Sequence, residues 1–167
     1  MKKTKALTFW PVLVGLVAVD CATKDLAVDK LTPAHVPHPV IGNVLRLTLA
    51  YNPDAAMGLS VGGYSRIAFS AIAVVMLFGL GFYYRQIADN GRPTAIALAL
   101  IGGGAAGNLI DRLRSSRGVV DFIDIGVGTA RFWTFNIADA GVFCGALLLM
   151  LVLARNDQVA ESGRPPG

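Results

Sequence analysis

Charged side chains are scarce in this sequence, and that scarcity sets the class of protein. Only 16% of the 167 residues are charged, whereas 54% are hydrophobic and the mean hydropathy is +0.56. Water-soluble domains carry about 25% charged residues. The composition therefore excludes an ordinary soluble domain and indicates an integral membrane protein.

The residues of most nucleotide, hydrolytic and metal sites are missing as well. The sequence has no phosphate-binding loop, no GxSxG elbow and no HExxH pair, and its two histidines, His35 and His38, lie in a Pro-rich loop. Its two cysteines, Cys21 and Cys144, have no CxxC spacing. We therefore expect no metal site, no cofactor and no disulfide framework.

Long apolar runs are what the sequence does contain. A helix rises about 1.5 Å per residue, so about 20 residues cross a bilayer. Four runs approach that length and predict transmembrane helices: Leu7–Ala27, Ile67–Tyr84, Pro93–Ile110 and Ile137–Ala154. We expect one membrane-embedded domain over residues 1–155, followed by a disordered polar tail over residues 156–167.

The first run follows a basic start, so a cleaved signal peptide is an alternative to a retained helix. Its end resembles a lipoprotein signal because Cys21 follows an apolar run, but Asp20 stands where a signal peptidase requires a small residue. The retained helix is the favoured interpretation. Four spans place both termini on one side, and Lys2, Lys3 and Lys5 predict that this side is the cytoplasm.

Two segments between the runs have the pattern of β-strands. Residues 36–51 alternate and are rich in Val, Ile and Leu around a Gly-Asn turn, and residues 117–135 are a second strand-like stretch. Residues Pro53–Leu59 predict a short surface helix with Asn52 at its N-cap. The predicted fold class is a mainly α membrane protein with four transmembrane helices, a small extracytoplasmic β-cradle and a short surface helix.

Polar residues that are uncommon in membrane spans recur at five places. These are Asp20 and Lys24, four apart in the first span; Asn52; Asn108, Asp111 and Arg112; Asp121 and Asp124; and Asn136 and Asp139. If successive spans alternate in direction, all five places reach the outer side. Ionisable groups inside membranes are functional by default, so the convergence predicts a site. The alternative is an ordinary collection of charged residues at span ends.

The reactive groups at these places are carboxylates. Two carboxylates that share a site do not both ionise easily, so one holds a proton while the other acts as a base on water. Such a pair hydrolyses amides without a cofactor, which predicts an aspartyl peptidase. Two other interpretations stay open. A small proton-coupled transporter predicts an internal repeat, which the sequence lacks, and a membrane assembly protein predicts structural ion pairs such as Asp20–Lys24.

Five short motifs occur along residues 7–155: DCATK, YNPDAAM, GGGAAGNLIDR, VVDF and FNIADA. In order and spacing they resemble the bacterial lipoprotein signal peptidase family, the type II signal peptidases. The resemblance implies that Asp121 and Asp139 form a catalytic dyad, whereas Asp111 and Asp124 match no dyad position. It also implies residues that shape or border the site: Asp20, Lys24, Asn52, Asn108, Arg112 and Asn136.

The resemblance further implies a substrate and a location. Members of this family cleave membrane-anchored prolipoproteins just before a cysteine that carries a diacylglyceryl group. We therefore expect prolipoproteins and membrane lipids as partners, no nucleic acid, and a functional monomer. The expected location is the bacterial cytoplasmic (inner) membrane, with the active site near its outer surface.

One departure from the family pattern lies beside the expected site. Members usually have Asn-x-Gly-Ala-Ala-Phe, whereas this chain has Asn52-Pro-Asp-Ala-Ala-Met, which adds a carboxylate at Asp54. The role of Arg112 is also open. It either holds the substrate carbonyl or adjacent backbone, or neutralises Asp111 and Asp20.

Overall fold

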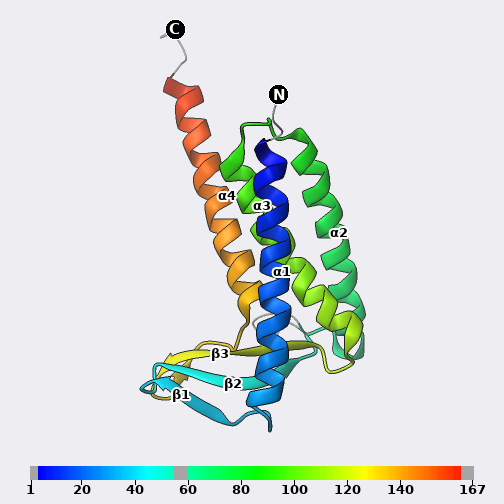
Figure 1. The fold of residues 1–167 in the computed structure, drawn as a ribbon, viewed down its shortest axis with the longest axis vertical. Helices are drawn as coiled ribbons and strands as arrows, with labels where there is room; N and C mark the ends of the chain where they lie inside the picture. The colour runs from blue at the N-terminus through cyan, green and yellow to red at the C-terminus, as the bar shows by residue number, and fades with distance from the viewer. Residues whose placement is uncertain (1–3, 55–59, 163–167) are drawn as a thin grey trace.

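Four long helices form the body of the protein in a computed structural model that describes residues 4–54 and 60–162. They are α1 (Thr4–Lys30), α2 (Ser65–Gln86), α3 (Arg92–Arg114) and α4 (Ile137–Ser162). All four are long and apolar enough to cross a membrane. Together with one small antiparallel sheet (Figure 1), they confirm the predicted class of a mainly helical membrane protein.

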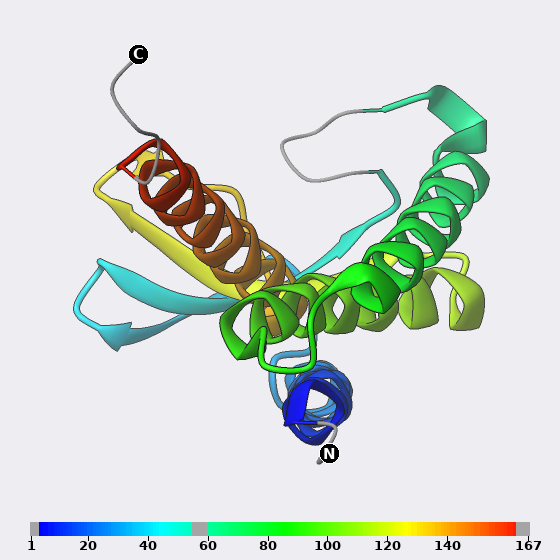
Figure 2. The ribbon, with the colours of Figure 1, turned by 90° about the horizontal axis from the view of Figure 1, so that it is seen from above.

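Helix α3 is the centre of the bundle. Its most apolar stretch is 56% buried inside the protein, against 6% for that of α2, because the other helices pack around α3 (Figure 2). The remaining helices present large side chains such as Phe78 and Phe143 to their surroundings, as membrane-facing helices do. Small residues along α3, among them Gly103, Gly104 and Gly107, permit this close approach.

Gly104 marks the closest contact between α3 and α4, and its replacement is expected to be costly. A Cβ atom at this position would overlap the backbone carbonyl of Ala138 and the side chain of Val142. A backbone carbonyl cannot rotate away, so we expect Gly104→Ala to lower the free energy of unfolding by about 1–3 kcal/mol. Thermal unfolding in detergent measures the loss.

The matched control for that substitution is Gly79→Ala in α2. A Cβ at Gly79 meets no other atom within 4 Å. Alanine also restricts the unfolded chain, so this variant should melt at or slightly above the temperature of the parent. Equal losses in the two variants would contradict the packing argument.

The sheet lies across one end of the bundle. Its strands are β1 (Pro37–Ile41), β2 (Leu45–Asn52), β3 (Val119–Val127) and β4 (Ala130–Arg131), antiparallel in the order β1-β2-β3-β4. The turn between β1 and β2 contains Gly42, whose φ of 50° favours glycine. Leu49 and Phe122 cluster with Ala27 in the last turn of α1 and with Leu31, which follows that helix. This apolar contact fixes the sheet to the helix ends.

Helix α4 extends past its membrane-spanning part. The span ends at Arg155, within one residue of the predicted Ala154. Residues 156–167 were expected to be disordered, but α4 continues to Ser162. Polar residues such as Gln158 and Glu161 form helix well, and a helix that leaves the bilayer keeps its internal hydrogen bonds. Residues 163–167 lie outside the described residues.

Most of the predicted surface helix, residues 55–59, also lies outside the described residues. At its expected start, Asn52 Oδ1 accepts a hydrogen bond from the Asp54 backbone N–H at 3.0 Å. This is the bond that an N-cap residue makes. A short 3-10 turn, η2 (Gly62–Tyr64), then leads into α2.

Candidate active site

The uncommon polar residues meet where the helix ends join the sheet. The C-terminal half of α1, the last turns of α3, the first turn of α4, the end of β2 and the middle of β3 come together there (Figure 1). Hydrogen bonds and ion pairs link the predicted site residues Asp20, Lys24, Asn52, Asn108, Asp121, Asn136 and Asp139 in one network, and Arg112 bonds to its edge. The convergence predicted from span direction is therefore present in the fold.

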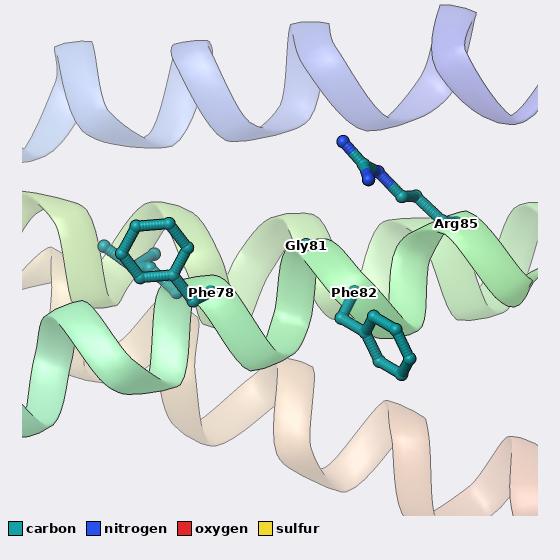
Figure 3. A pocket seen from close by; sticks show the side chains of 5 residues that line it. Phe78, Gly81, Phe82 and Arg85 are labelled. Carbon is teal, nitrogen blue, oxygen red and sulfur yellow. The ribbon is translucent and has the colours of Figure 1, made fainter.

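A hollow of about 430 Å³ lies away from this network and is lined by none of its residues. It lies along α2 and is lined by Leu77, Phe78, Gly81, Phe82 and Arg85 (Figure 3). In Figure 3 the two phenylalanine rings and the guanidinium of Arg85 point in different directions. The hollow has no carboxylate or nucleophile in its lining, so the candidate active site is the polar network.

Asp121 lies on β3 and is almost fully buried, at 3% exposure. Its Oδ1 accepts a hydrogen bond from Asn136 Nδ2 at 2.7 Å, and its Oδ2 accepts one from Asn52 Nδ2 at 3.3 Å. Asn52 reaches it because β2 and β3 are paired, with Ala50 opposite Asp121. Each carboxylate oxygen of Asp121 is thus held by a neutral amide donor.

Asp139 lies in the first turn of α4, held by a reciprocal cap. The Asn136 backbone N–H donates to Asp139 Oδ2 at 3.2 Å, while Asn136 Oδ1 accepts from the Asp139 N–H at 2.9 Å. Residues three apart at a helix start form such a capping box. Asp139 Oδ1 also accepts a hydrogen bond from Asn108 Nδ2 at 2.7 Å. The local sequence N-x-x-D therefore both starts the helix and orients the carboxylate.

Asn136 is the residue that joins the two carboxylates. It is fully buried, and its Nδ2 lies within hydrogen-bond distance of Asp121 Oδ1, Asn108 Oδ1 and the Val120 carbonyl. Its other amide atom and its backbone bond Asp139. One buried residue therefore makes hydrogen bonds to both carboxylates.

Lys24 joins α1 to the network through three polar contacts. Its ammonium lies 2.8 Å from Asp20, 2.9 Å from Asp111 and 2.8 Å from Asn108 Oδ1. Because an ammonium only donates, it fixes which end of the Asn108 amide is oxygen and directs Nδ2 at Asp139. Asp20 in turn accepts the Ala138 N–H at 2.9 Å at the start of α4. The sequence placed Lys24 at the border of the site and gave no signal for its bond to Asn108.

Arg112 forms no ion pair with Asp111 or Asp20 among the described residues, whereas Lys24 pairs with both. Arg112 Nη2 donates to the Asp54 carbonyl at 3.1 Å and its Nη1 to the Asn108 carbonyl at 3.3 Å. Its Nε has no hydrogen-bond partner among the described residues. Arg112 binds backbone carbonyls, which is the chemistry that a peptide substrate also presents.

Asp124 lies outside the network, although it is three residues from Asp121 on the same strand. Both Arg46 and Arg131 pair with it, at 2.9 Å and 2.7 Å, and Thr48 donates to it at 3.1 Å. Burial acts to raise the pKa of Asp124, but these hydrogen bonds outweigh it and hold the pKa below its ordinary value. Asp124 is a structural carboxylate that ties the strands together.

The pKa of Asp121 is shifted in the opposite direction from that of Asp124. No cation pairs with it directly among the described residues. Burial, followed by repulsion from Asp139, raises the pKa of Asp121 to about 7. Asp121 therefore differs from Asp124, because it is partly protonated near neutral pH.

The family described as Signal peptidase (SPase) II matches residues 12–155 of the chain. The chain belongs to this family. A lipoprotein signal peptidase of Geobacter metallireducens is 36% identical over 146 residues, 87% of this chain and 88% of the relative. One of Geobacter sulfurreducens is 35% identical over 159 residues, 95% of this chain and 98% of the relative.

Solved structures agree with the family. A bacterial membrane enzyme determined by the in meso method at 2.3 Å resolution has a TM-score of 0.81 and 28% identity, covering 100% of this chain and 96% of that chain. A second bacterial membrane enzyme, at 1.9 Å, has a TM-score of 0.75 and 30% identity, covering 92% and 94%. The chain is a multi-pass membrane protease, a signal peptidase II that acts on prolipoproteins in a membrane.

Proposed function

We propose that this signal peptidase II cleaves diacylglyceryl-modified prolipoproteins just before the lipidated cysteine, and that Asp121 and Asp139 activate the attacking water. The observation that carries the proposal is the Asn136 bridge. It holds a carboxylate from β3 and one from α4 in one hydrogen-bonded unit. Within the described part of the chain neither carboxylate is paired with a cation within 4 Å, which distinguishes them from Asp20, Asp111 and Asp124.

In the proposed reaction the two carboxyl groups share one proton. Ionised Asp139 takes a proton from water, whose oxygen attacks the scissile carbonyl carbon while the acid form of Asp121 donates its proton to the carbonyl oxygen. The resulting diol collapses as Asp139 returns its proton to the leaving amide nitrogen and Asp121 recovers its own. The C–N bond breaks, and a carboxyl and an amine form without any cofactor.

The amide side chains around the dyad suit an unwound substrate. A transmembrane helix satisfies its own backbone groups, so a scissile bond that leaves the helix needs partners from the enzyme. Asn52 and Asn108 donate and accept hydrogen bonds without adding charge. Arg112 already donates to two backbone carbonyls. We propose that it also donates to a carbonyl of the substrate backbone next to the scissile bond.

We also propose an orientation in the bacterial cytoplasmic membrane. The start of α1 and the end of α4 lie at the same end of the bundle, opposite the sheet (Figure 1). The basic residues Lys2, Lys3 and Lys5 favour the cytoplasm for that end. The dyad then lies near the outer surface, where lipid chains hold the substrate cysteine at a fixed depth. The enzyme acts as a monomer in this proposal, because both carboxylates come from one chain.

The lipid requirement tests the proposal. Purified enzyme in detergent is given one prolipoprotein in two forms, with and without the diacylglyceryl group. We expect rapid cleavage of the modified form only, with a new N-terminus at the lipidated cysteine by mass spectrometry. Equal cleavage of both forms, or cleavage at another bond, would refute the proposed specificity.

The pH dependence of cleavage follows from the raised pKa of Asp121, about 7. The proton of its acid form is present below that pH and is lost above it. We therefore expect kcat/KM to fall by about tenfold for each pH unit above the pKa. A pH–rate profile measures this. Asp124→Asn is the control, since Asp124 titrates well below this range and should leave the profile unchanged. A rate that rises through pH 7 would contradict Asp121 as the acid.

A further inference from the structure

One carboxylate close to the dyad has no part in the proposed reaction. Asp54 follows the end of β2 by two residues. Its backbone N–H donates to Asn52 Oδ1 at 3.0 Å, and its backbone carbonyl accepts a hydrogen bond from Arg112 Nη2 at 3.1 Å. The backbone of a single residue therefore contacts two of the side chains that surround the dyad.

The hydrogen bond from Asp54 sets the orientation of the Asn52 amide. A backbone N–H only donates, so the end of the amide that faces Asp54 is the oxygen. The other end, Nδ2, then faces Asp121 and donates to its Oδ2 at 3.3 Å. An amide that is free to rotate also presents its oxygen to the carboxylate, and the bond is then lost. The position of residue 54 thus controls a hydrogen bond to the dyad.

The Asp54 side chain is anchored on the segment that enters α2. The hydroxyls of Ser65 and then Ser60 stabilise its ionised carboxylate and hold the pKa of Asp54 below its ordinary value. Ser65 is 2% exposed, and its Oγ accepts the Val61 N–H at 2.8 Å, which leaves the hydroxyl proton available to an acceptor. The Ser60 hydroxyl lies 3.3 Å from that of Ser65. A buried serine therefore gives the carboxylate a fixed point of attachment.

The groups around Asp121 show what the Asn52 bond contributes. Burial and then the charge of Asp139 on α4 raise the pKa of Asp121, whereas hydrogen bonds from the Asn52 and Asn136 amides lower it. The cations that face Asp121 are Lys24 on α1 and Arg112 on α3. An amide bond that stabilises the ionised form is removed when Asn52 turns away. Loss of this bond therefore raises the pKa of Asp121 further.

We propose that Asp54 is a positioning residue for cleavage. Its carboxylate, held by Ser65 and Ser60, fixes the backbone that orients Asn52 toward Asp121 and that binds Arg112. Asp54 does not touch the reacting atoms, and its effect passes through these two side chains. The inference rests on the function proposed above, because it takes Asp121 as the acid of the dyad.

The pH–rate profile of Asp54→Ala tests this role, because a loss of packing alone does not move such a profile. Single-turnover cleavage of a diacylglyceryl-modified prolipoprotein is measured across neutral and alkaline pH, well below the melting temperature of each variant. We expect Asp54→Ala to lower the rate on the plateau by about fivefold and to move the fall in rate by about half a unit to higher pH. Asp54→Asn keeps an oxygen that accepts from the serine hydroxyls, so it should stay close to the parent.

Ser65→Ala removes the other side of the same anchor. It should show the same loss and the same shift, and the double variant with Asp54→Ala should be no slower than either single variant. The control is Asp29→Ala, which removes an exposed carboxylate whose ion-pair partner among the described residues is Lys30. We expect this control to leave the rate and the profile unchanged.

Three results would overturn the inference while the parent rate still falls above the pKa of Asp121. These are an unmoved profile in Asp54→Ala, additive effects of Asp54→Ala and Ser65→Ala, and a shift in Asp54→Asn as large as that in Asp54→Ala. A parent rate that does not fall above that pKa would instead overturn Asp121 as the acid, and this inference with it.

Discussion

Replacing Asp139 or Asp121 with asparagine is expected to slow cleavage by about 10³-fold or more. Asparagine has nearly the same shape as aspartate but neither releases nor accepts a proton at neutral pH. Asp139→Asn removes the proposed base and Asp121→Asn the proposed acid. Because the two groups act on one water, the double variant should be about as slow as either single variant. Single-turnover cleavage of a diacylglyceryl-modified prolipoprotein measures these rates.

Asp124→Asn is the matched control for the dyad variants. Asp124 is also buried and lies on β3, but its partners are Arg46 and Arg131. Its replacement weakens two ion pairs, so the protein should melt at a lower temperature while cleaving at nearly the parent rate below that temperature. Asp121→Asn should show the reverse, a small change in melting at pH 8 and almost no cleavage. If Asp121→Asn and Asp139→Asn cleave as well as Asp124→Asn, the dyad assignment is wrong.

Lys24→Met is expected to cause the largest loss of stability, about 3–5 kcal/mol. Methionine fills similar space but carries no charge, so it leaves the buried carboxylate of Asp20 and the partly buried carboxylate of Asp111 without their cation. It also removes the donor that orients Asn108 toward Asp139. Denaturant unfolding in detergent measures the stability, and cleavage of the folded fraction measures the orientation effect.

The exposed ion pair of Lys30 provides the comparison. Lys30 lies 2.8 Å from Asp29, but both side chains are more than two-thirds exposed, at 69% and 68%. Solvent screens such pairs, so Lys30→Met should change stability by less than about 1 kcal/mol. Adding Asp20→Asn to Lys24→Met should recover part of the loss, because it removes one stranded charge. Equal losses from Lys24→Met and Lys30→Met would contradict the central role of Lys24.

Much of the fold could be predicted from local pattern. Each of the four apolar runs has about the length that a membrane span requires, and each forms a helix long enough to cross a membrane. The Gly-Asn turn and the alternation of residues 36–51 likewise correspond to β1 and β2. The end of α4 was not predictable from hydropathy, because hydropathy reports where a helix leaves the membrane and helix propensity decides where it stops.

Part of the candidate site could also be predicted from the sequence, and part depends on tertiary contacts. Composition, the missing nucleophile motifs and the recurrence of carboxylates at places on one side of the membrane were enough to predict a carboxylate site, because hydropathy makes an acid such as Asp139 in an apolar run conspicuous. The choice of Asp121 and Asp139 among these acids came from the family resemblance. Which acids are free and which are neutralised depends on contacts between residues far apart in sequence. Lys24 pairs with Asp111, Arg131 and Arg46 pair with Asp124, and Arg112 binds the carbonyl of Asp54.

The sequence by itself therefore determined a four-span membrane protein, since hydropathy and helix length are properties of single segments, and it predicted a carboxylate site. Only the tertiary structure decided that Asn136 bridges Asp121 and Asp139 and that the pKa of Asp121 is raised. Burial and the distance to other charges set that pKa, and both quantities exist only after α4 and β3 have packed together.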